Sequence, residues 1–149
     1  MTHRKTLRNR NAVMILALAA LVVPGIASQS FAADDAVVDS GAWTKKTASI
    51  AGKWSVVTRG VERFVVLDAA FKTKNAPDLK LFLSPAPLAR LSGDNATEGA
   101  MFLGKLTSNK GGQEFAIPRG VDLKRFKTVI IHCEKYAKLW GGAALKKAE

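Results

Sequence analysis

Residues 128–134 read Thr-Val-Ile-Ile-His-Cys-Glu, and this stretch decides the fold class. β-Branched and apolar residues are typical of strands, and successive side chains in a strand point to opposite faces. Val129, Ile131 and Cys133 therefore share one face. His132 belongs to the other face, which we expect to be the wetter one. No later or earlier stretch of the domain keeps the apolar period of 3.6 that predicts a helix, so strands are expected throughout.

Short apolar runs of the same kind recur along the chain, separated by Gly, Pro, Asn and Asp. They cover residues 49–58 and 63–67, joined as a hairpin at Arg59-Gly60, then residues 79–83, 101–106, 115–117 and 140–145. We expect the last of these to be an edge strand. Seven or so short strands about ten residues apart predict an all-β fold, an antiparallel β-sandwich or barrel-like single domain.

The first 32 residues have the composition of a secretory signal peptide. Four basic residues and no acid precede an apolar stretch over residues 12–23, and the small-residue tripeptide Ser30-Phe31-Ala32 follows. Cleavage is expected after Ala32; the alternative is an uncleaved anchor. The mature protein is then exported to the periplasm or outside the cell, and it does not span a membrane after cleavage.

The remaining sequence divides into a short acidic spacer over residues 33–40 and one domain over residues 41–149. Removing the signal leaves 149 − 32 = 117 residues with 23 − 4 = 19 basic and 12 acidic side chains, a net charge of +7. The lysines are scattered rather than clustered with aromatics, which argues against a nucleic-acid partner. Weak electrostatic binding to anionic cell-envelope polymers fits the surplus of basic residues better. The alternative is that the excess charge only keeps the surface soluble.

The ligand inventory excludes several kinds of site. Cys133 is the single cysteine, so no intramolecular disulfide exists, and His132 is the one histidine that remains after cleavage. Blue-copper and zinc sites need more ligands than these, so no metal site is expected. The covalent haem motif C-x-x-C-H is absent, as are the motifs of hydrolases.

Three stretches together resemble the electron-transfer DM-thirteen domain family. They are residues 129–136 with the following Trp140, the block from Phe71-Lys72-Thr73 through Pro77-Asp78-Leu79 to Leu83-Ser84, and residues 106–113. The resemblance runs from about residue 41 to about residue 145. It implies an extracytoplasmic, all-β domain that acts in electron transfer with an unknown redox partner protein. It also implies that the cysteine acts as a bare thiol or as a ligand of a prosthetic group such as haem.

Cys133 is accordingly the candidate redox thiol or ligand, although a cysteine in phase with Val129 and Ile131 is equally consistent with a small buried hydrophobe. His132 and Met101 are possible ligands of a non-covalent haem. Their alternatives are a half-exposed surface histidine and a core methionine. The leading hypothesis is an exported redox or electron-transfer module, an electron carrier or thiol-redox accessory rather than a hydrolase. The alternative is a non-catalytic envelope module that binds an anionic polymer or a partner protein.

Overall fold

The computed structural model describes residues 35–146, which all lie in one compact unit of the chain. The predicted signal peptide, residues 1–32, lies outside the described residues. Strand β10 (Thr128–Cys133) forms the centre of a five-stranded antiparallel sheet. It pairs with β7 (Leu79–Ser84) on one side and with β11 (Lys138–Ala144) on the other. All six residues of β10 are buried, which explains why its sequence is nearly continuously apolar.

The sheet is completed at its two edges by β8 (Met101–Lys105) and by the two-residue strand β2 (Thr44–Lys45). The expectation that residues 140–145 form an edge strand is therefore wrong, because β2 pairs beyond β11 at Gly141 and Gly142. Two residues cannot be recognised as a strand from sequence, since they carry no periodicity.

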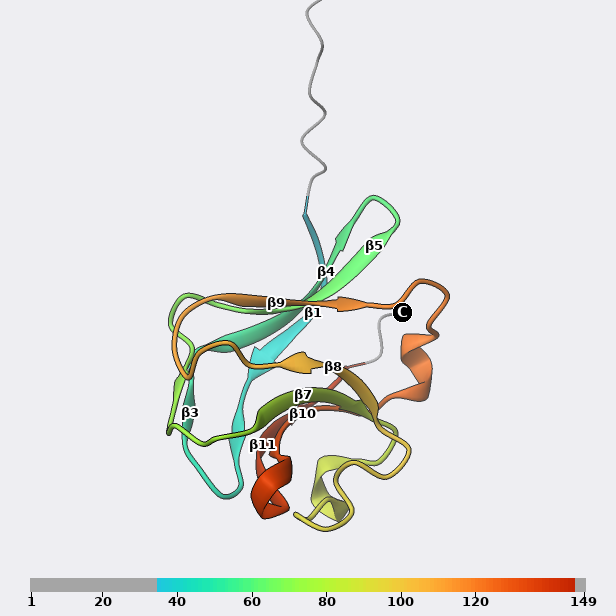
Figure 1. Cartoon of the computed structure of the whole chain (residues 1–149). Coiled ribbons are helices and arrows are strands. Elements are labelled where there is room, and N and C mark those ends of the chain that lie inside the picture. The colour runs from blue at the N-terminus through green and yellow to red at the C-terminus, as the bar shows by residue number, and fades with distance from the viewer. Residues whose placement is uncertain (1–34, 147–149) are drawn as a thin grey trace, which may run out of the picture. The chain divides into compact units, whose positions relative to one another are not determined.

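A second antiparallel sheet has the order β1-β4-β5-β9. Its strands are β1 (Ala36–Ala42), β4 (Lys53–Arg59), β5 (Glu62–Leu67) and β9 (Gln113–Ile117). The hairpin predicted at Arg59-Gly60 is confirmed: β4 and β5 pair in register, and Gly60 supplies a φ of 58° in the two-residue turn. The two sheets lie face to face (Figure 1), so the predicted all-β, sandwich-like fold is confirmed.

Two expectations about the strand boundaries need correction. The spacer expected over residues 33–40 is strand from Ala36 onward, because β1 pairs with β4 from Ala36 to Ala42, with a bulge between Val37 and Asp39. The single strand expected over residues 49–58 is interrupted at Gly52, which has a φ of 83°. It separates β4 from the short strand β3 (Ile50–Ala51), which pairs with β6 (Lys72–Thr73). A Cβ at this position would lie 2.6 Å from the backbone nitrogen of Phe71, so this bend requires glycine.

The core has two parts, one on each face of the sheet that contains β10. Between the sheets, a large apolar cluster includes Trp54, Phe71, Leu81, Ile131 and Cys133. On the outer face a smaller cluster contains Phe82, Leu91, Ala96, Ile130 and Leu139.

The segment between β7 and β8 contributes Leu91 and Ala96 to the outer cluster, and it includes the 3-10 turn η1 (Leu88–Arg90). Two further 3-10 turns, η2 (Leu123–Arg125) and η3 (Glu134–Tyr136), flank β10. Among residues 35–146, no helix has the length and apolar character needed to cross a membrane.

Candidate functional site around Cys133

Cys133 is the last residue of β10 and has no exposed surface. It is a free cysteine, with Leu79 and Lys138 as its cross-strand neighbours. Val129 and Ile131 lie in the same inter-sheet cluster, as the alternation of the sequence predicts. A thiol in such apolar surroundings is poorly reactive, and a disulfide with a second molecule cannot form while the thiol stays covered.

The turn η3 follows Cys133 directly in the chain, and its residues are exposed to solvent. The turn is held by a bond from the Glu134 backbone nitrogen to the carbonyl of Asp78 at 3.2 Å. A second bond, from the Ala137 nitrogen to the carbonyl of Glu134, measures 3.1 Å. Ala137 then takes a left-handed conformation with a φ of 46°, which is strained for a residue with a Cβ. The thiol is thus buried next to a short, exposed and partly strained turn.

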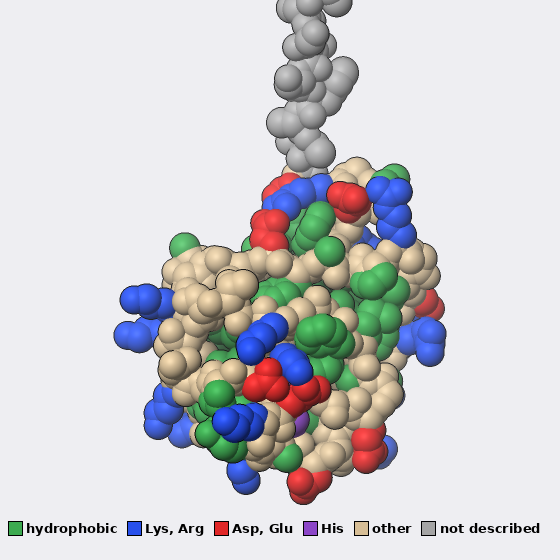
Figure 2. Space-filling model, viewed as in Figure 1, with side chains coloured by type: hydrophobic (Ala, Val, Ile, Leu, Met, Phe, Trp, Pro, Cys, Tyr) green, Lys and Arg blue, Asp and Glu red, His purple; other side chains and the backbone are tan. Residues whose placement is uncertain are grey.

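A group of ion pairs links the turn η3 and the residue before β7 to strands β7 and β8. Lys80 on β7 pairs with Glu134 and also lies 3.4 Å from Asp78, and Lys105 on β8 lies 3.6 Å from Asp78. The bond to Glu134 is the main cause that raises the pKa of Lys80. The Lys80 ammonium is also 5.8 Å from the ring centre of Phe102, which is 53 % exposed. Figure 2 shows basic and acidic side chains gathered on this face next to apolar surface.

His132 is buried, so the expectation of a half-exposed surface histidine is wrong. Its ring contacts Phe82 edge-on in the outer cluster, and its Nε2 lies 2.8 Å from the carbonyl oxygen of Gly93. The segment between β7 and β8 covers this face, which no local pattern in the strand indicates. His132 and Cys133 therefore point into different clusters on opposite faces and cannot bind the same ion.

Met101 lies partly buried at the start of β8 and packs against the inter-sheet cluster. It pairs with Leu83, whereas Cys133 pairs with Leu79 at the other end of β7. These two positions on β7 are four residues apart, which is about 14 Å along an antiparallel strand.

The three candidate ligands thus lie in three different places, and the described residues do not fit a haem held by any two of them. No group of three or more His, Cys, Asp or Glu side chains suited to a metal occurs within residues 35–146.

Residues 43–145 match the model of the family described as Electron transfer DM13. The chain belongs to this family. The resemblance predicted from the sequence is confirmed, and the DM13 domain covers the chain from β2 to β11, with β1 just outside the match. Comparison with curated proteins and with solved structures yields no match.

The aromatic side chains of the DM13 domain lie mainly in its core. Trp54 and Trp140 are buried in the inter-sheet cluster that also holds Cys133. Trp43 packs against Phe71 with a ring distance of 6.4 Å. Tyr136, in the turn η3, is 55 % exposed, and Phe102 on β8 is 53 % exposed. Of these tryptophans, Trp140 lies both in the same core cluster as Cys133 and on β11, the strand next to β10.

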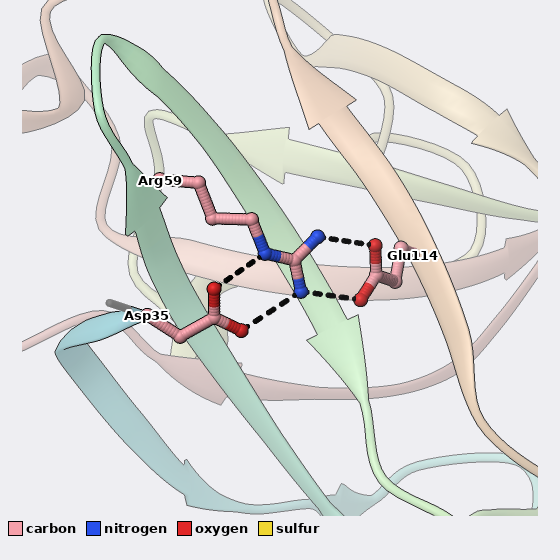
Figure 3. A network of polar contacts seen from close by, with 3 residues as sticks. All are labelled: Asp35, Arg59 and Glu114. Atoms are coloured by element: carbon pink, nitrogen blue, oxygen red, sulfur yellow. Dashed lines mark hydrogen bonds and ion pairs between the residues drawn. The ribbon is translucent and has the colours of Figure 1, made fainter. Parts of the chain in front are cut away.

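An ionic network of the DM13 domain that the sequence does not predict ties together the two edges of the other sheet. Arg59 on β4 donates to Asp35, just before β1, at 2.7 and 3.0 Å, and to Glu114 on β9 at 2.7 Å twice (Figure 3). Its guanidinium also lies 5.0 Å from the ring centre of Phe64. These bonds hold the pKa values of Asp35 and Glu114 below their usual range and raise the pKa of Arg59. Because Arg59, Asp35 and Glu114 are already bonded to one another, we interpret this network as structural. Cys133 remains the candidate redox group.

Proposed function

We propose that this DM13 protein is an exported thiol-redox module whose electron transfer uses Cys133. The observation that carries the proposal is the family match over residues 43–145, which includes the single cysteine. Export is supported by the signal-like composition of residues 1–32. The haem version of the proposal is not favoured, since Cys133, His132 and Met101 do not converge on one site.

The burial of Cys133 makes access the controlling step. We infer that the thiol reacts from a locally opened state in which η3 detaches, since exposed turns open at a lower free energy than core strands. In that state the Cys133 thiol loses its proton to solvent. Its Sγ attacks one sulfur of a disulfide in a partner protein. A new S–S bond forms, the partner's S–S bond breaks, and the second partner sulfur leaves as a thiolate.

The test combines an absorption spectrum with a thiol titration on protein purified from its own host. We expect no haem absorption, slow but complete reaction of one thiol under native conditions, and a trapped mixed disulfide that a Cys133→Ser variant does not form. An unreactive thiol together with no partner adduct would refute the thiol mechanism. A haem band that disappears in the Cys133→Ser variant would instead support a ligand role.

A second candidate function is the binding of an anionic envelope polymer. Within residues 35–146 the ion pairs involve only Arg59, Lys80, Lys105 and Arg119 among the basic side chains. The other lysines and arginines of that part therefore form no ion pair with an acidic side chain of residues 35–146. This function predicts co-sedimentation with cell-wall material that Cys133→Ala leaves intact and that salt weakens. Sedimentation unchanged at about 1 M salt, where the screening length is about 3 Å, would contradict it.

A further inference from the structure

Three loops meet at the end of the sandwich that lies lowest in Figure 1. They are residues 46–47 after β2, residues 91–94 after η1 and residues 137–139 at the start of β11. Between them is a depression of about 280 Å³. Loops gathered at one end of a rigid sandwich are a common place for a binding site.

The side chains around the depression are mainly polar. Lys46 and Lys138 contribute ammonium groups, Thr47 and Ser92 contribute hydroxyls, and Asp94 contributes a carboxylate. All five residues are exposed. No ion pair joins Lys46, Lys138 or Asp94 to another residue of the described range. Within the described part of the chain, the two ammonium groups and the carboxylate are thus without an ion-pair partner, and two hydroxyls lie beside them.

The walls of the depression are held in place by several independent contacts. The Nε2 of His132 binds the carbonyl of Gly93 from below at 2.8 Å. The Asn95 side chain accepts from the Ser92 nitrogen at 2.8 Å and donates to the carbonyl of Arg90 at 3.2 Å. On the opposite wall, the Thr47 nitrogen donates to the carbonyl of Leu139 at 3.1 Å. A site with walls fixed in this way loses little conformational entropy when it binds a ligand.

Two backbone features show that the loops are also packed tightly against each other. A Cβ at Gly93 would lie only 2.0 Å from the carbonyl oxygen of Ala137. Ala137 itself has the one positive φ of a non-glycine residue within residues 35–146. Beneath the loops, the Nδ1 of His132 is buried without a hydrogen-bond partner. Strain and an unsatisfied polar group both cost free energy, and they persist where the surrounding structure enforces them.

We propose that this depression, which we call the end pocket, binds a sugar unit that carries one anionic group, either a phosphate or a carboxylate. The two lysines match the single anionic group, since an ammonium is a point charge suited to either anion. The Thr47 and Ser92 hydroxyls and the Asp94 carboxylate match the hydroxyls of the ring as donors and acceptors. The volume of the end pocket suits one such unit and falls just below the range typical of drug-sized ligands. His132 is a positioning residue for this pocket and does not touch the ligand. The inference does not depend on the redox chemistry of Cys133.

The test is a nuclear magnetic resonance titration of the protein produced in its own host. The probes are D-glucuronate, glucose 1-phosphate, neutral D-glucose and inorganic phosphate. We expect saturable shifts of the amides of Thr47, Ser92 and Asp94 with at least one anionic sugar. Glucose and inorganic phosphate should each bind about tenfold more weakly, because each lacks half of the contacts. The two anionic sugars distinguish a carboxylate ligand from a phosphate ligand.

Variants on the pocket and away from it complete the design. Lys46→Met and Lys138→Met should each weaken the anionic sugar by about fivefold, as expected for an exposed charge pair. Lys124→Met, an equally exposed change in η2, should leave the affinity unchanged, and so should Cys133→Ala. No saturable shift with either anionic sugar, equal affinity for inorganic phosphate, or affinities that Lys46→Met and Lys138→Met leave unchanged would each overturn the proposal.

Discussion

The indole Nε1 of Trp140 donates a hydrogen bond of 2.9 Å to the Oγ1 of Thr73, and both residues are buried. The same hydroxyl donates at 2.9 Å to the carbonyl of Ser49. This chain of two bonds connects β11, the short strand β6 and the segment before β3. It satisfies the polar edge of a tryptophan that lies in the same core cluster as the cysteine.

Replacing Thr73 by Val should destabilise the protein by about 1–3 kcal/mol, because the Trp140 N–H and the Ser49 carbonyl both lose a buried partner. Thr73→Ser keeps the hydroxyl and should retain most of the stability. Urea denaturation monitored by tryptophan fluorescence measures the difference. Equal stability of Thr73→Val and the wild type would contradict the role of this bond.

The Arg59 network should stabilise the folded protein at neutral pH and lose this effect at acid pH. The pKa values of Asp35 and Glu114 are lowered in the folded protein from 3.8 and 4.5, so their contribution is present above those values. It is lost as the pH falls through the lower, folded-state values. Thermal unfolding of the wild type and of Arg59→Met should therefore differ at about pH 7 and converge below about pH 3.

Arg119→Met is the control for this network, since Arg119 forms a single exposed pair with Glu62 at 3.1 Å. It should change the melting temperature less than Arg59→Met does. A difference between the wild type and Arg59→Met that stays constant down to acid pH would show that the side chain acts through packing on Phe64 rather than through charge.

The reactivity of Cys133 should follow the stability of η3. Ala137→Gly removes the strain of the positive φ and should stabilise the closed turn by about 1 kcal/mol, which corresponds to about fivefold slower labelling of the thiol. Lys80→Met releases Glu134 and should accelerate labelling. Native-state labelling with an alkylating reagent, followed by mass spectrometry, provides the rates. Identical rates in all three proteins would mean that the thiol becomes accessible by another opening.

Gly93 should tolerate no side chain. The Cβ of Gly93→Ala would lie 2.0 Å from a backbone oxygen, so the loop must move, at a cost of about 1–3 kcal/mol. Gly112→Ala is the matched control, since its Cβ would meet its nearest atom at an ordinary 3.5 Å. Hydrogen exchange of residues 91–95 should become faster in Gly93→Ala only. Unchanged exchange there would contradict the close packing of this loop against Ala137.

Local sequence patterns predicted much of the sandwich. The alternation in residues 128–134 and 79–83 places β10 and β7 correctly, and Arg59-Gly60 marks the hairpin between β4 and β5. These features depend on side chains within a few residues of each other. The acidic residues near Ala36 suggested a spacer, because the pairing partner of β1 lies some twenty residues further along the chain, in β4. The break at Gly52 was missed for a similar reason, since the backbone of Phe71 enforces it.

Composition, periodicity and short motifs were sufficient to predict the fold class, the family and the identity of the single thiol, because each of these is a property of residues close together in the chain. The packing of distant segments buries Cys133, places His132 beneath Gly93, and puts Met101 on β8 beside the end of β7 that is farther from Cys133. The end pocket and the Arg59 network likewise combine residues from distant segments. Burial and contact depend on which segments pack over a strand, and that is a property of the whole chain rather than of its neighbouring residues.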